Sequence, residues 1–298
     1  EYCSLHELLD SYSVLFQKQG KTQTAEMIES IFYNAAQGSR NPNHSCIAYL
    51  KTDNSFEMMG TKNGEVEPNR KQTRYKYSPA HQDVAVCCNP NAGRITPYFL
   101  AKAWLKENEN TLVNAWLAPS ILATHIQNKP IRIETITEYP FQNSITFKIS
   151  NPHKIKFQIK IRKPSWAIEI KTKEKYGIEN DWIVFDRIFQ EVDSIQFAFE
   201  TNVLVREDLN QEKYFSYGAL FYAKSIEAIE QKGKTYASDF NDWMYEPKEL
   251  IRYAFIKDHQ AQFEKGMVKI KAMNKNTNQT EWIELIPFGK TILRQVSF

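Results

Sequence analysis

The chain contains 298 residues, of which 42% are hydrophobic and 13% aromatic, enough apolar material for one large domain or two to three smaller ones. Its 38 basic and 35 acidic side chains leave a formal net charge of +3 that is spread along the sequence. No single-sign field therefore points to nucleic acid or to an anionic membrane, and we expect neither as a partner. The absence of any run of about 18 apolar residues also excludes a membrane-spanning helix.

The first part of the chain, to about residue 107, predicts helices interrupted by one long insertion. Apolar residues recur at helical spacing from Leu5 to Phe16, and Ser4 and Glu7 have the spacing of a capping box, which predicts a helix that starts at Ser4. Residues 1–3 would then lie just before this helix in an extended conformation. A second apolar series, from Ala25 to Ala35, predicts a helix that ends near Gly38.

The insertion covers residues 39–86, which are rich in Asn, Lys, Thr and Gly and show only short strand-like pieces such as residues 46–50. This composition is typical of a long functional loop. Thr96 followed by Pro97 predicts the start of a third helix, because Pro is favoured at the first helical position. Its apolar face would include Tyr98, Ala101, Trp104 and Leu105.

After residue 110 the apolar period changes from that of a helix to that of a β-strand. Alternating or β-branched stretches separated by turn residues predict a strand-rich region of the β-sandwich type. The stretches are 111–118, 131–138, 145–149, 155–161, 182–185, 195–199, 219–222, 267–272 and 280–286. We expect one or two β-sandwiches, with a boundary between about residues 202 and 213.

Three helices do not close a compact bundle easily, so their apolar faces would seek further partners. The chain also opens on Glu1, without an initiator Met or a leader peptide. We therefore expect that further helices precede Glu1 in the intact protein.

The candidate chemistry lies in the cysteines. Glu1 and Cys3, together with the adjacent pair Cys87 and Cys88, supply one carboxylate and three thiols, and zinc sites are usually built from four such groups. Cys3 alone is more typical of a small buried residue at a helix start. The pair could be inert, could form a strained vicinal disulfide, or could face one metal from the turn that Asn89-Pro90-Asn91 predicts. Cys46 has no such neighbour, and we expect it to be a buried side chain with a packing role only.

Several motifs resemble the bacterial β-L-arabinofuranosidases of glycoside hydrolase family 127. They are Glu1-x-Cys3, the stretch from Ala25 to Asn34, and Cys87-Cys88-Asn89-Pro90-Asn91-Ala92-Gly93-Arg94. The resemblance extends to later stretches and weakens after about residue 230. These stretches are Ala118-Pro119-Ser120, Tyr139-Pro140-Phe141, Ile161-Arg162-Lys163-Pro164-Ser165-Trp166 and Tyr217-Gly218-Ala219-Leu220-Phe221-Tyr222-Ala223.

The resemblance implies a mixed α and β fold, in which the C-terminal helices of an (α/α)6 barrel are followed by two β-sandwich domains. The corresponding domains are residues 1–110, 111–205 and 206–298. It also implies one Zn²⁺ ion bound by Glu1, Cys3, Cys87 and Cys88, with Cys87 as the catalytic nucleophile and Glu29 as a carboxylate that contacts the sugar. The substrate would be a plant-type oligosaccharide or glycan that ends in β-L-arabinofuranose or a related furanoside.

The general acid/base glutamate of the family lies upstream of the Glu-x-Cys motif and therefore precedes Glu1. A positioned general acid contributes about 10²- to 10⁴-fold in rate, so we expect this chain alone to be inactive or nearly so.

Two alternatives to the glycosidase remain open. One is a carbohydrate-binding or structural β-sandwich protein whose cysteines hold a structural zinc ion, and the other is a non-catalytic relative without metal. His44 and His81 could touch a sugar but are more typical of solvated or locally bonded loop residues. The six Trp side chains are mostly expected in the core, and Arg94 is expected to have a structural role.

Overall fold

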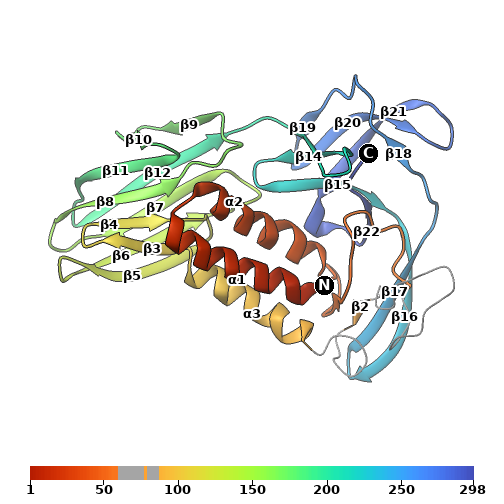
Figure 1. Ribbon diagram of the computed structural model, residues 1–298, viewed down its shortest axis with the longest axis horizontal. Helices are drawn as coiled ribbons and strands as arrows, with labels where there is room; N and C mark the ends of the chain where they lie inside the picture. Colours follow the sequence, from red (N-terminus) through yellow and green to blue (C-terminus); the bar gives the residue numbers. More distant parts are fainter. Residues whose placement is uncertain (60–76, 79–86) are drawn as a thin grey trace. The chain divides into compact units, whose positions relative to one another are not determined.

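The computed structural model describes residues 1–59, 77–78 and 87–298, which form a mixed fold that is mostly β-sheet with few helices (Figure 1). None of the helices in these residues is long and apolar enough to cross a membrane. The chain divides into two compact units, which are described separately. Unit 1 contains residues 1–8, 30–95 and 203–298, and unit 2 contains residues 9–29 and 96–202.

The helices lie in the first hundred residues, as their apolar periodicity predicts. They are α1 (Tyr2–Gln19), α2 (Thr22–Ser30), the π-helical segment η1 (Ile31–Ala36) and α3 (Cys88–Ala101). Segment η1 continues α2 directly, and helical residues run to Gly38. The predicted end of the second helix is therefore confirmed.

The helix start predicted at Ser4 is wrong. Helix α1 begins at Tyr2, because the Ser4 amide donates a hydrogen bond to the Glu1 carbonyl (3.1 Å) and so closes the first turn from Glu1. Ser4 and Glu7 consequently lie inside the helix and do not form its cap. Cys3 is a helical residue, and only Glu1 precedes the helix.

The predictions for the third helix are also wrong in two respects. Asn89, Pro90 and Asn91 do not form a turn but belong to the first turn of α3, where the missing amide hydrogen of a Pro costs no helical bond. The helix start predicted at Thr96 and Pro97 is wrong as well, because α3 begins at Cys88 and continues through Pro97. The carbonyl that Pro97 leaves without a helical partner belongs to Gly93, which is exposed and therefore accessible to water.

The structure of residues 104–108 also differs from the prediction. Helix α3 ends at Ala101, and Trp104, expected on its apolar face, begins strand β3 (Trp104–Asn108).

Unit 2 contains two five-stranded sheets with strand orders β10-β11-β8-β4-β3 and β5-β6-β7-β12-β9. Strands β4 and β8 pair in parallel, and the other pairs in these sheets are antiparallel. The strands are β4 (Thr111–Asn114), β5 (Ser120–Ile126), β6 (Lys129–Thr137), β7 (Ser144–Ser150), β8 (Lys156–Arg162), β9 (Glu169–Thr172), β10 (Gly177–Glu179), β11 (Trp182–Ile188) and β12 (Val192–Glu200).

Strand β7 of unit 2 buries one of its two faces, as the alternation in the sequence predicts. In β7, Ile145, Phe147 and Ile149 are buried, whereas Ser144 and Lys148 are exposed. The ring of Phe147 lies 5.2 Å from that of Trp104, between centroids, which joins a strand of one sheet to a strand of the other.

Within unit 2, Trp116 holds the helical residues on the sheets. Its side chain is 1% exposed, and its ring lies 6.0 Å from Phe16 of α1 and 5.7 Å from Phe99 of α3. Its indole Nε1–H donates to the carbonyl of Phe99 (2.8 Å). The one polar atom of the indole is thereby satisfied in the core.

Unit 1 contains a larger antiparallel sheet in the order β13-β14-β15-β21-β20-β18, to which β19 and β22 add by pairing with β20 and β15. A second sheet has the order β1-β2-β17-β16. The strands are β1 (Ile47–Ala48), β2 (Tyr77–Ser78), β13 (Leu204–Glu207), β14 (Lys213–Tyr217), β15 (Leu220–Ile226), β16 (Ala228–Ala237), β17 (Phe240–Pro247), β18 (Tyr253–Ala254), β19 (Gln262–Glu264), β20 (Met267–Asn274), β21 (Thr280–Pro287) and β22 (Leu293–Gln295), with the 3-10 turn η2 (Phe288–Lys290).

Arg294 of β22 anchors the C-terminal strand of unit 1 to the residues that follow η1. Its guanidinium donates to the carbonyls of Gly38 (2.8 Å), Thr52 (3.0 Å) and Asp53 (2.8 Å), and it lies 3.7 Å from the centroid of the Phe288 ring. Burial lowers the pKa of Arg294 to about 10, so the side chain keeps its charge at neutral pH.

Arg294→Met should lower the free energy of unfolding by about 3 kcal/mol, because one buried and two partly buried carbonyl oxygens lose a charged donor, and the bond to the buried Gly38 carbonyl alone is worth about 1.5–3 kcal/mol. Arg132→Met is the matched control, since Arg132 is exposed and forms only a surface ion pair with Glu134 (3.5 Å). Urea unfolding followed by tryptophan fluorescence measures both. Equal losses of unfolding free energy in the two variants would contradict the anchoring role of Arg294.

Candidate functional site: a cluster of three cysteines and a glutamate

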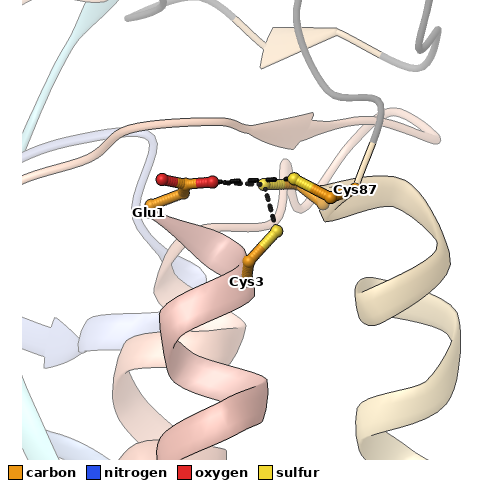
Figure 2. Close-up of side chains that lie close together, drawn as sticks. Glu1, Cys3 and Cys87 are labelled. Atoms are coloured by element: carbon orange, nitrogen blue, oxygen red, sulfur yellow. Dashed lines mark hydrogen bonds between the residues drawn. The ribbon is translucent and has the colours of Figure 1, made fainter.

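Four side chains with sulfur or carboxylate ligand atoms meet in unit 1 (Figure 2). Glu1 lies just before α1 and Cys3 lies in its first turn, while Cys87 lies just before α3 and Cys88 is its first residue. One ligand atom from each residue lies within 4.8 Å of the other three. The starts of α1 and α3 therefore bring together the four residues that the sequence predicts as metal ligands.

The spacing of these atoms suits a tetrahedral metal ion. Around zinc, with bonds of about 2.3 Å to sulfur and 2.0 Å to oxygen, neighbouring sulfurs lie about 3.8 Å apart and a sulfur and an oxygen about 3.5 Å apart. The thiols of Cys87 and Cys88 donate to Glu1 Oε1 at 3.6 and 3.8 Å. The sulfurs of Cys3 and Cys88 are 3.1 Å apart and would separate slightly around an ion. The set could hold one metal ion.

Glu1 and Cys3 do not meet by the extended backbone that the sequence predicts. Two residues of one helix that are two positions apart point in directions about 200° apart. This rule does not apply here, because Glu1 lies outside α1 and its side chain can turn back over the first turn toward Cys3 (Figure 2). All four cysteines are free thiols, so the pair does not form a vicinal disulfide.

The charges in the cluster are unequal without a metal. Burial acts to raise the pKa of Glu1, but hydrogen bonds from Tyr49, Cys3 and Cys87 outweigh it and hold that pKa below its ordinary value. The hydrogen bond with Cys3, followed by burial, raises the pKa of Cys87, and burial raises the pKa of Cys88. At neutral pH the carboxyl group is therefore ionised while these two thiols keep their protons. A bound divalent cation would leave the carboxyl group ionised and would also deprotonate the coordinating thiols.

The two adjacent cysteines differ in exposure. Among the described residues, Cys88 is buried, Cys3 is partly buried and Cys87 is exposed. Cys87 is consequently the sulfur of the pair that a molecule in solvent can approach. The resemblance assigns the nucleophile to the same residue.

Two further residues, one bonded to Glu1 and one that contacts neighbours of the ligands in sequence, have no signal in the sequence. The Tyr49 hydroxyl donates to the Glu1 carboxylate, and the Tyr49 carbonyl accepts a hydrogen bond from the Tyr2 amide (3.2 Å). Arg40 donates to the carbonyl of Ala92 in α3, and its Cζ lies 5.8 Å from the centroid of the Tyr2 ring. Both residues come from the insertion, whose composition predicts a functional loop without indicating which side chains matter.

Glu29 lies in unit 2 and is 1% exposed. Its Oε1 accepts a hydrogen bond from the Leu117 amide (2.9 Å), and its Oε2 accepts one from the Tyr139 hydroxyl (2.8 Å) and pairs with the Arg162 guanidinium. Both oxygens therefore have protein donors. The sugar contact of Glu29 stays a prediction.

The ion pair of Glu29 belongs to a larger network that joins α2 to the strands of unit 2. Arg162 also donates from Nε to the carbonyl of Ala115 (3.1 Å) and lies 3.7 Å from Glu26. Glu26 in turn accepts hydrogen bonds from the amide (3.1 Å) and the hydroxyl (2.6 Å) of Ser165.

Of the two candidate histidines, His44 lies among the described residues and His81 outside them. His44 Nε2 lies 3.1 Å from Glu230 Oε2, and its ring stacks on Trp243 with centroids 3.8 Å apart. Its partners come from the β16–β17 hairpin, so the partly exposed His44 is bonded to residues far away in sequence and not locally.

The remaining candidates have mainly structural surroundings. Cys46 is buried in an apolar cluster, as predicted. Arg94 is exposed and donates to Asn91 within the same helix. Most of the Trp prediction holds, because Trp104, Trp116 and Trp166 are buried and Trp182 and Trp243 are partly buried, whereas Trp282 is 47% exposed.

Comparisons with known proteins bear on this site. Residues 111–201 match the family model described as "Beta-L-arabinofuranosidase, GH127 middle domain". The resemblance to glycoside hydrolase family 127 (GH127) is confirmed. None of the curated proteins compared with the sequence matches it.

Solved GH127 structures share the fold of the whole chain. A GH127 β-L-arabinofuranosidase from Geobacillus stearothermophilus T6 aligns over 100% of this chain and 48% of its own, with a TM-score of 0.66 and 16% identity. A structure described as a glycoside hydrolase aligns over 100% of this chain and 51% of its own, with a TM-score of 0.67 and 14% identity. A GH127 β-arabinofuranosidase aligns over 97% of this chain and 47% of its own, with a TM-score of 0.64 and 13% identity. The chain thus spans about half the length of these structures.

The purified chain should contain about one metal ion per molecule, and Cys88→Ala should lose it, because three ligands then remain. Cys46→Ala is the matched control, since it also removes a buried thiol but lies outside the cluster. Elemental analysis after gel filtration measures the metal content. Retention of the metal by Cys88→Ala, or its loss in Cys46→Ala, would contradict the assignment of the ligands.

Glu29→Gln should lower the free energy of unfolding by about 3–5 kcal/mol, because it leaves the buried Arg162 without its closest counter-charge. Glu109→Gln is the control, since Glu109 pairs with Lys106 at the surface (3.0 Å) and should change stability little. Denaturant unfolding of both variants checks this expectation. A Glu29→Gln variant as stable as the control would show that the pair does not anchor α2.

Proposed function

We propose that these residues form the nucleophile-bearing part of a retaining glycoside hydrolase that releases terminal β-L-arabinofuranose, or a related furanoside, from plant-type glycans. The observation that carries the proposal is the convergence of Glu1, Cys3, Cys87 and Cys88 on one point, with the Cys87 sulfur exposed. The match of residues 111–201 to the GH127 middle domain supports the same family of reactions.

In this proposal helices α1, α2 and α3 are the last helices of an (α/α)6 barrel, and residues 111–205 and 206–298 are two β-sandwich domains. The similarity in fold to GH127 structures of about twice the length supports this arrangement. The general acid/base would then be a carboxylate that precedes Glu1. The sugar contact of Glu29 enters the proposal from the resemblance alone, since both of its oxygens have protein donors.

The metal of the proposal is zinc, since three thiols and one carboxylate are a ligand set that zinc accepts and that magnesium or calcium would not. When bound, zinc would hold Cys3, Cys87 and Cys88 as thiolates at neutral pH. Cys87 is the exposed member, so Cys3, Cys88 and Glu1 would serve as ligands that take no part in bond making.

The reaction proceeds in two steps at the Cys87 sulfur. In the first, this sulfur attacks the anomeric carbon, the bond from that carbon to the leaving oxygen breaks, and the upstream carboxylic acid gives its proton to the leaving oxygen. In the second, water attacks the same carbon, gives a proton to the carboxylate, and the carbon–sulfur bond breaks. Two inversions retain the configuration of the sugar.

A structural zinc site in a non-catalytic carbohydrate-binding protein is the second candidate. It is favoured by one observation, because four protein ligands complete a tetrahedral set, and structural zinc sites are closed in this way. The two candidates differ in whether Cys87 ever forms a bond to sugar.

A chain joined to the upstream residues that carry the general acid should hydrolyse an aryl β-L-arabinofuranoside, whereas the 298-residue chain alone should be slower by about 10²-fold or more. In the extended chain, Cys87→Ser should abolish turnover and Cys46→Ala should not. With an aryl leaving group that needs no proton, mass spectrometry should find one pentosyl unit on the peptide that contains Cys87. Full metal binding without this adduct would support the structural site.

A further inference from the structure

The four ligands of the cluster lie at the starts of two helices that are far apart in sequence. Glu1 and Cys3 belong to the start of α1, and Cys87 and Cys88 belong to the start of α3. A metal centre needs its ligand atoms placed to within about 0.2 Å of their bonding distances. Some contact in unit 1 must therefore fix the first turns of the two helices relative to each other.

Arg40 makes contacts with both helix starts. Tyr2, whose ring lies 5.8 Å from the Arg40 Cζ, is the residue between Glu1 and Cys3 and is 1% exposed. Ala92, whose carbonyl accepts a hydrogen bond from Arg40 Nη2, lies about one helical turn after Cys88. A single planar guanidinium thus packs near the Tyr2 ring and binds the backbone of α3.

The backbone of Arg40 is itself held in place. Its amide donates to the carbonyl of Gln37 at the end of the preceding helical segment (3.0 Å), and it forms an antiparallel bridge with Ile47. The amide of Ala48 donates to the carbonyl of Ser39 (2.8 Å), which closes the same narrow hairpin. The guanidinium therefore extends from a fixed base rather than from a free loop.

The charge of Arg40 also suits this place. Three thiolates, one carboxylate and one divalent cation together carry a net formal charge of about −2. A half-buried guanidinium that contacts Tyr2 and Ala92, which are near the ligands in sequence, has the sign that offsets part of this charge. Arg94, by contrast, is exposed and donates to Asn91 of its own helix, and within the described part of the chain it joins no two elements.

We propose that Arg40 is a positioning residue of the metal centre, which bridges the first turn of α1 and the N-terminal part of α3 and so sets the geometry of the four ligands. This inference rests on the metal site of the proposed function. It assigns Arg40 no contact with the metal or with substrate, and it predicts that the planar fork matters as well as the charge.

The experiment measures cobalt and zinc binding by the 298-residue chain and by Arg40→Met, Arg40→Lys and Arg94→Met. Zinc affinity is obtained by competition with a chromophoric chelator, and ligand geometry from the thiolate-to-cobalt charge-transfer bands. Arg40→Met should bind zinc about 10- to 100-fold more weakly and show altered cobalt bands, as is typical when a residue that orients metal ligands is removed. Arg94→Met should bind as the parent chain does.

Arg40→Lys separates the effect of the charge from that of the planar shape. It also replaces Arg40→Met in the test if circular dichroism shows that Arg40→Met does not fold. Lysine keeps the charge but cannot form the planar bridge, so affinity should stay clearly below that of the parent chain. Parental affinity and cobalt bands in either folded Arg40 variant would overturn the proposal while leaving the metal site intact. A parent chain that binds neither metal would overturn both.

Discussion

The mutual repulsion of like groups is the constraint on which the rest of this structure depends. Three thiols and one carboxyl group lie within 4.8 Å of one another, and each of them is an anion once it loses its proton. Such a group stays together in the ionised form only around a cation. Without one, the raised pKa values of Cys87 and Cys88 keep those thiols neutral and therefore poor nucleophiles. The chemistry of the site thus depends on what binds there.

Unit 1 builds the cluster from helix starts rather than from strands. Helix starts suit this purpose, because their first amide groups have no intrahelical partners and carry a partial positive charge that favours nearby anions. The insertion between η1 and α3 supplies Arg40 and Tyr49, which contact residues at these starts. Residues of low periodicity therefore complete a site whose ligands lie at the ends of regular elements.

The two units share one structural device, a buried arginine that binds groups distant in sequence. Arg162 joins Glu29 of α2 to the strands of unit 2, and Arg294 joins the last strand of unit 1 to the carbonyls of Gly38 and Thr52. The two cases differ in their partners, since Arg162 has a buried carboxylate and Arg294 has mostly neutral oxygens. This difference explains why burial lowers the pKa of Arg294, whereas the charge of Glu29 outweighs burial for Arg162.

The sequence by itself determined the strands of alternating polarity, such as β7, and the four candidate ligands, because period and residue type are local properties. It did not determine that Cys3 is helical, that α3 runs through Pro97, or that the polar stretch Ala228–Ala237 is a strand. These depend on hydrogen bonds and packing that the tertiary structure supplies. Only that structure brought Glu1 and Cys3 to Cys87 and Cys88, and gave Arg40 and Glu29 their partners, because contacts between residues far apart in sequence leave no trace in local periodicity.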